Sequence, residues 1–100
     1  MKVPVSTRQN APLPPRQVRA IARALSDPNR YQILKMVAAD SIKACTDLRK
    51  AFDITAPTLS HHLKELESAG LVEIVHRGKF AEIVFCRDVW DAYMAELAQI

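Results

Sequence analysis

The stretch "TAPTLSHHLKELESAGLVE", residues 55–73, carries the pattern that decides the fold. Thr55 at its start is a good helix N-cap residue, and Gly70 follows as a glycine at a helix C-terminus should. Three leucines recur at helical spacing: Leu59, Leu63 and Leu66. Two adjacent histidines, His61 and His62, stand among them. They raise the question of whether this helix binds a metal ion or contacts a larger partner.

The two histidines point in different directions on the predicted helix. At about 100° per residue, His61 lies about 200° from Leu59 and faces away from the leucines, whereas His62 lies on the shoulder of the apolar stripe. Neighbouring residues that diverge so far cannot bind one ion from one face. His61 with Glu65 would supply two ligands and no third. We therefore predict no metal here, and we expect His62 to pack inward and to bond across the neighbouring turn.

Upstream of this stretch, the apolar spacing predicts three helices, over residues 15–25, 28–39 and 46–52. Pro15 suits the first turn of the first helix, and Asp27 followed by Pro28 suits the start of the second. The connector "ADSIKAC" is expected to be extended around Ile42. The tight turn "DIT" then leads into Thr55.

Downstream, the period changes from 3.6 to 2. The segments "LVEIVHR" and "FAEIVFCR" alternate on either side of a short "GK" turn, which predicts a β-hairpin. The last segment, "DVWDAYMAELAQI", is expected to form a helix capped by Asp88. The order is α-α-α-α-β-β-α, a mainly α fold with a hairpin. Two short helices joined by a tight turn and followed by a hairpin predict a winged helix-turn-helix.

Domain organisation follows from the same pattern. Residues 1–14 are Pro-rich and aperiodic, and we expect a flexible arm. Residues 15–100 are expected to form one DNA-binding and dimerisation domain. Of all residues 49% are hydrophobic and 25% charged, which is typical of a globular chain. No apolar run approaches ~18 residues and no secretory signal is present, so we expect a cytoplasmic protein with no membrane partner.

The charge distribution favours an anionic partner. The net charge is +3, but residues 1–35 hold seven basic groups and one acidic group, and the rest of the chain is net acidic. An enzyme is not expected, because the sequence has no nucleophile–base–acid set and no glycine-rich phosphate loop. Only two glycines are present, Gly70 and Gly78. No cofactor is predicted.

The candidate DNA contacts lie on the outward face of the helix in 55–73 and on the hairpin tip. The helix face is polar, basic and rich in hydroxyl groups, and an α-helix fits the major groove of DNA. The hairpin tip "HRGK" supplies cations to a minor groove or backbone. The predicted contacts are Thr55, Pro57, Thr58, Ser60, His61, Lys64, Arg77 and Lys79. Arg49 and Lys50 are further candidates for phosphate contacts.

Three segments carry a family resemblance. "ALSDPNRYQILKMV" and "TAPTLSHHLKELESAGLVE" resemble the helix-turn-helix signatures of the arsenic-repressor (ArsR/SmtB-type) regulators, and "HRGKFAEIVF" resembles their wing. The resemblance covers roughly residues 17–100. It implies a homodimeric winged-helix repressor on an inverted-repeat DNA operator. An alternative is a winged-helix protein-interaction module without DNA affinity, which the basic helix and wing disfavour.

In this family the first and last helices pair between subunits. Two apolar stripes in this sequence agree with that arrangement, although they could also pack within one chain. The predicted dimer residues are Val18, Ile21, Leu25, Trp90, Tyr93, Met94 and Leu97.

The family's usual sensor motifs are missing. Where relatives carry Cys-x-Cys before Asp-Leu, this sequence reads "KACTDL", with Ala44 and Thr46 at the thiol positions. The last helix has no His for zinc. Cys45 and Cys86 leave three readings open: a redox pair, a thiol-bound metal or metalloid, or small packing residues. Nothing in the sequence names an inducing signal.

Overall fold

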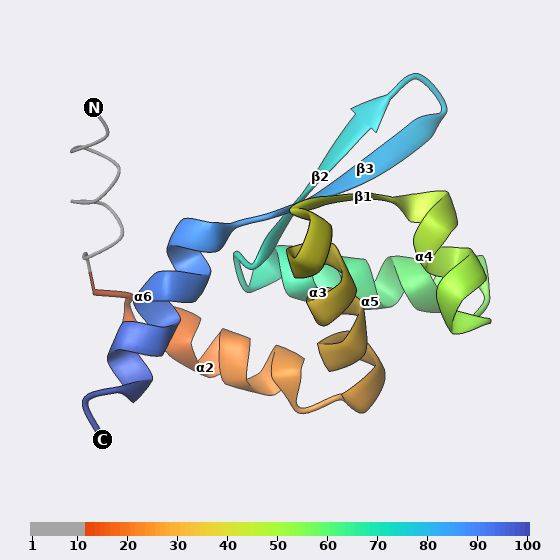
Figure 1. Cartoon of the computed structure of the whole chain (residues 1–100). Helices are drawn as coiled ribbons and strands as arrows, with labels where there is room; N and C mark the ends of the chain where they lie inside the picture. The colour runs from red at the N-terminus through yellow and green to blue at the C-terminus, as the bar shows by residue number, and fades with distance from the viewer. Residues whose placement is uncertain (1–11) are drawn as a thin grey trace, which may run out of the picture.

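The computed structural model describes residues 12–100 as helices and one three-stranded sheet. The elements in chain order are α2 (Pro15–Leu25), α3 (Pro28–Asp40), β1 (Ile42–Ala44), α4 (Cys45–Phe52), α5 (Ala56–Ser68), β2 (Val72–Arg77), β3 (Phe80–Phe85) and α6 (Arg87–Leu97) (Figure 1). This order confirms the predicted helices and hairpin. The predicted arm, residues 1–14, lies outside the described residues except for residues 12–14.

The sheet contains a strand that the sequence indicated only as an extended connector. β3 is the central strand and pairs antiparallel with both β1 and β2. Ile83 of β3 lies opposite Lys43 on one side and Ile74 on the other. β1 therefore ties the chain between α3 and α4 to the base of the hairpin.

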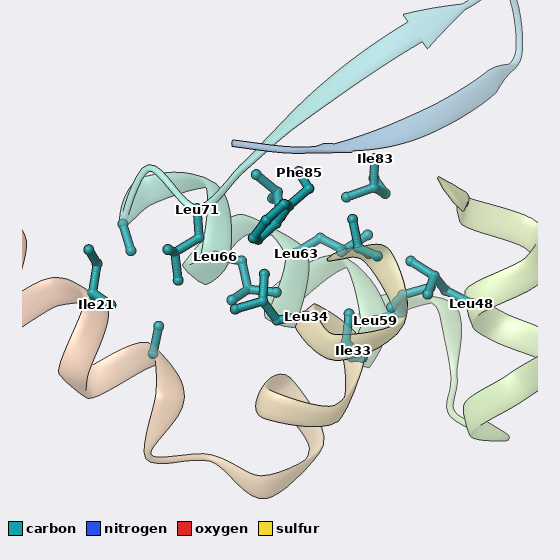
Figure 2. Packing of buried hydrophobic residues seen from close by; sticks show 14 of the residues in the cluster. Ile21, Ile33, Leu34, Leu48, Leu59, Leu63, Leu66, Leu71, Ile83 and Phe85 are labelled. Atoms are coloured by element: carbon teal, nitrogen blue, oxygen red, sulfur yellow. The ribbon is translucent and has the colours of Figure 1, made fainter. Parts of the chain in front are cut away.

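The core forms around α5. Its three leucines are at most 3% exposed, and they lie among Ile33 and Leu34 of α3, Leu48 of α4, and Ile83 and Phe85 of β3 (Figure 2). Burying one such side chain stabilises the fold by about 1.5–3 kcal/mol. Because α5 is held from three sides, its remaining face has a fixed orientation toward solvent.

The C-terminus of α5 is fixed by backbone hydrogen bonds and by α2. The Leu71 N–H donates to the Leu66 carbonyl (3.0 Å) and the Gly70 N–H to the Glu67 carbonyl (2.9 Å), a Schellman motif. Gly70 has φ +84°, and a Cβ there would lie 2.5 Å from Nε2 of Gln17. That Nε2 donates to the Ala69 carbonyl (3.1 Å), so α2 is locked against the end of α5.

The start of α6 differs from the prediction. Asp88 was expected as its cap, but the helix begins at Arg87, with Cys86 at the N-cap position and no side-chain cap bond. The Cys86 N–H donates to the carbonyl of Leu71, the residue before β2 (2.9 Å), so the chain that leaves β3 is tied to the start of the hairpin. Asp88 lies in the first turn, where a carboxylate favours the helix dipole.

Candidate nucleic-acid interface

The turn between α4 and α5 sets the direction of α5. Asp53 ends α4 in the left-handed conformation (φ 48°, ψ 49°), which a short polar side chain tolerates. Thr55 then caps α5, and its Oγ1 accepts the Thr58 N–H at 3.3 Å. Pro57 follows in the first turn, where its missing N–H leaves no helical bond unmade. The first turns of α5 are therefore presented outward from a fixed start.

The predicted contacts on α5 are all exposed. These are Thr55, Pro57, Thr58, Ser60, His61 and Lys64. The Thr55 hydroxyl also donates to Oγ1 of Thr58 at 2.9 Å, so its first role is to hold the helix start. His61 is exposed whereas His62 is 6% exposed, which confirms that the two side chains point in different directions, as predicted.

The hairpin tip carries Arg77 and Lys79, both exposed. Nε of Arg77 donates to Oε1 of Glu82 at 2.8 Å, a partner that the sequence reading missed. Arg77 and Glu82 are five residues apart on either side of the two-residue turn, and this spacing could have predicted the pair. An exposed pair of this kind contributes little to stability, and the other guanidinium N–H groups remain available for a phosphate. Phe80 follows Lys79 at the hairpin tip and is 61% exposed, and it is not among the candidate contacts predicted from the sequence.

Helix α5, the candidate recognition helix, lies beside the hairpin β2–β3, the candidate wing. Side chains from α4, α5, β2 and β3 line a single cavity, with Arg49, Lys64 and His76 among them. Arg49 and Lys50 are exposed on α4. Of the candidate cations, the cavity therefore brings together Arg49 and Lys64, whereas Lys50, Arg77 and Lys79 lie outside its lining.

The buried His62 links α5 to the turn between α2 and α3. Its Nδ1 lies 3.5 Å from Nη1 of Arg30, and because a guanidinium only donates, Nδ1 accepts. Nε of Arg30 donates to the Ala24 carbonyl at 2.9 Å, and its backbone N–H donates to Oδ1 of Asp27 at 3.0 Å. His62 is thus buried, as the sequence predicted, but its partner lies in α3 and not across the turn between α4 and α5, where the sequence placed it.

Burial lowers the pKa of His62 below its usual value, and the Arg30 and His61 charges act in the same direction against the opposing effect of Asp27. Backbone N–H donation, chiefly from Arg30, likewise holds the pKa of Asp27 below its usual range. Because the pKa of Asp27 is lowered, its carboxylate takes up a proton only below about pH 4. His62 is therefore the group of this pair that responds to mild acid.

Mild acid is expected to destabilise the fold through His62. The unfolded chain takes up the proton first, so the stabilisation is complete above about pH 6.5 and is lost as pH falls through the lower folded-state pKa. Urea unfolding between pH 7.5 and 5 checks this. In H62Q this part of the loss is expected to disappear, whereas H61Q, at the exposed neighbour, retains it. Equal pH dependence in wild type and H62Q would contradict the assignment.

The two cysteines are free and far apart along the sheet. Ala44, just before Cys45, lies opposite Glu82, and Cys86 lies four residues beyond Glu82. At ~3.3 Å per residue this separation is roughly 13 Å, beyond the ~7 Å between Cα atoms that a disulfide spans. The register therefore disfavours a disulfide between them within one chain.

Cys86 is also poorly suited to thiol chemistry. Burial raises its pKa, with smaller contributions from the Asp88 and Glu73 carboxylates, so little reactive thiolate is present. Within residues 12–100, no group of three or more His, Cys, Asp or Glu side chains is placed to hold a metal ion. No helix in that part of the chain is long and apolar enough to cross a membrane.

The predicted dimer residues divide into two sets. Ile21 and Tyr93 are buried within the single chain, at 0% and 6% exposure, with the Tyr93 ring 6.0 Å from that of Trp90. Both side chains pack in the hydrophobic core of their own chain. The side chains that remain accessible are Val18 and Leu25 of α2, which are half-buried, and Trp90, Met94 and Leu97 of α6. Figure 1 shows α2 and α6 at the opposite end of the molecule from α4.

Comparison with known proteins places this arrangement in a family. Residues 25–75 match a family described as a helix-turn-helix domain. The chain belongs to this family. Over 57 residues it is 40% identical to an arsenical resistance operon repressor of Staphylococcus xylosus, an alignment that covers 57% of this chain and 54% of that protein. The chain thus spans about half the length of the curated relatives that it matches first.

Solved structures confirm the winged helix-turn-helix fold and the ArsR type. The crystal structure of an ArsR family transcriptional regulator superimposes with a TM-score of 0.78 at 26% identity, over 89% of this chain and 91% of that one. A homodimeric winged helix-turn-helix DNA-binding domain from Mycobacterium bovis, a possible ArsR-family regulator, gives 0.68 at 28% identity, over 82% and 76%. These two proteins are described as a transcriptional regulator and a possible one, and neither is described as an enzyme.

Proposed function

We propose that this chain is a sequence-specific, DNA-binding transcriptional repressor that acts as a homodimer on an inverted-repeat operator. The observation that carries the proposal is the exposed polar and basic face of α5 beside a basic hairpin tip, on an ArsR-type fold. Residues 15–100 act as the DNA-binding and dimerisation domain. The protein works in the cytoplasm and needs no metal cofactor for DNA binding.

The side chains of the proposed interface have different roles. Lys64 on α5 and Lys79 on the wing neutralise phosphates, with Arg77, Arg49 and Lys50 in support. Thr58, Ser60 and His61 project from the first turns of α5 and reach base edges in the major groove. Thr55 and Pro57 hold the helix start against the backbone of the DNA.

The homodimer is supported by uncovered apolar side chains. Met94 and Leu97 near the end of α6 are 38% and 40% exposed, and the relative from M. bovis is homodimeric. A second copy would cover them. A twofold dimer presents two α5 helices to two half-sites about 34 Å apart, one turn of B-DNA.

Selection from a pool of randomised duplexes tests the function. Wild-type protein is expected to enrich a site with two mirrored half-sites. Failure to enrich any sequence, with a folded protein, would refute DNA reading, and enrichment of a single unsymmetrical site would refute the dimer geometry.

Replacing His61 with alanine is expected to relax specificity at one base position. Loss of a base contact costs about 1–3 kcal/mol on the selected site and little on random DNA. Fluorescence anisotropy on both duplexes at one salt concentration measures the two affinities. An equal loss on both would show that His61 contacts only the backbone.

Replacing Met94 with glutamate is expected to weaken the dimer, because a charge would be buried without a partner at the subunit interface. Sedimentation equilibrium should show a shift toward monomer. A95E, at the exposed neighbouring position outside the predicted stripe, serves as the control and should leave the association constant unchanged. If M94E associates as tightly as wild type, α6 is not the interface.

A further inference from the structure

A cavity of about 400 Å³ lies between the recognition helix, α4 and the hairpin. Its apolar lining includes Leu59 and Leu63 of α5, Ile74 of β2 and Ile83 of β3. This volume is within the range of small-molecule sites, which are mostly apolar with a few polar groups. The core leaves it open because the wing diverges from α5 toward its tip, as Figure 1 shows.

The mouth of the cavity is cationic. Arg49 of α4 and Lys64 of α5 both line it and are both exposed. Within residues 12–100 neither forms a salt bridge. Glu67 also lines the cavity and is negatively charged, but the Ile74 N–H donates to its Oε2 at 3.2 Å, and the two cations outweigh its single charge. An apolar interior under two unpaired cations is complementary to an organic anion.

We propose that this cavity binds an amphipathic carboxylate with an aromatic or acyl body. The apolar body lies against the half-buried Ile74 and Ala81, above Leu59 and Leu63, and displaces the water of the cavity. The carboxylate accepts charge-assisted hydrogen bonds from Arg49 and Lys64 at the mouth.

Occupancy of the cavity opposes DNA binding, an effect that rests on the function proposed above. Ser60 and Lys64 line the cavity and also belong to the proposed DNA contacts. A bound carboxylate pairs with Lys64 and holds an anion where a phosphate would lie. DNA and the carboxylate therefore compete, and the carboxylate acts as an inducer.

Cys45 provides a reporter that does not depend on DNA. Its thiol lines the cavity, whereas Cys86 lies outside the lining, at the N-cap of α6. The test uses 1-naphthaleneacetate as probe and its neutral amide as control. Alkylation of each cysteine by iodoacetamide is followed by peptide mass spectrometry, with and without the probe. The carboxylate should slow modification of Cys45 and leave the intrinsically slower modification of Cys86 at its own rate, and the amide should bind roughly tenfold more weakly.

Two substitutions, A81W and R49Q, locate the bound probe, and A51W is the control. A81W places a large ring on a lining residue of β3 and should abolish protection of Cys45, whereas A51W, on an exposed α4 position outside the lining, should not. R49Q changes an exposed side chain, so it should fold normally and bring the carboxylate's affinity closer to that of the amide, with Lys64 retaining part of the preference. Equal protection of both cysteines, no protection, or equal affinity for carboxylate and amide would overturn the proposal.

The same samples separate this inference from the proposed function. Protection of Cys45 without any DNA binding by the ligand-free protein supports the cavity and refutes the DNA function. Tight DNA binding that is unchanged when the probe saturates Cys45 protection overturns the inducer role. Loss of DNA affinity in parallel with Cys45 protection supports both.

Discussion

Replacing Leu66 with alanine is expected to lower the free energy of unfolding by about 2–5 kcal/mol. Leu66 is fully buried on α5, and its carbonyl also receives the Leu71 N–H that closes the helix. The substitution removes apolar contacts and leaves a cavity that the surrounding α2, α3 and β3 cannot fill without moving. Since whole domains are stable by only about 5–15 kcal/mol, much of the native state would be lost on mild heating.

Urea unfolding monitored by circular dichroism measures this change. The control is K64A, two residues earlier on the same helix, where an exposed side chain is replaced by another good helix former. Its effect should stay within about 0.5 kcal/mol. If L66A were no more destabilising than K64A, the inward face assigned to α5 would be wrong.

Removing Lys64 and Lys79 together is expected to abolish most DNA affinity while leaving the fold intact. A dimer loses about four phosphate contacts, so the slope of log K against log salt should fall in magnitude by about 3–4. The affinity at ~0.1 M salt should fall roughly a thousandfold, on the selected site and on random DNA alike. Salt titrations by fluorescence anisotropy measure both quantities.

A charge-matched variant tests whether position or net charge matters. Lys35 on α3 and Lys43 on β1 lie outside the proposed interface, and K35A/K43A removes the same two charges per chain. This variant should keep most of the affinity and nearly the wild-type slope. Equal losses in the two double variants would reduce the interface to a general effect of net charge.

The outward face of α5 could be predicted from the sequence because helical geometry alone fixes it. Once Leu59, Leu63 and Leu66 define the buried side, His61 and Lys64 have to face solvent. The starts of α3 and α5 could be predicted from capping residues. Asp27 caps α3 and Thr55 caps α5, and both accept backbone N–H groups as their residue types suggest.

Features that depend on contacts between distant segments could not be predicted. β1 is only three residues long, too short for an alternating pattern, and it exists because β3 offers a free edge. The pairing of Arg77 with Glu82 depends on the hairpin register. Ile21 and Tyr93 belong to apolar stripes that read as interfaces, but both are covered by their own chain.

The central feature of the proposed function is recognition of a DNA sequence by α5. The decisive measurement compares the affinity of the wild-type protein for its selected duplex with that for a scrambled duplex of the same length and composition, at one physiological salt concentration. We expect the selected duplex to bind at least ~10³-fold more tightly. Equal affinities for the two duplexes would contradict the account and leave only non-specific attraction between a basic surface and DNA.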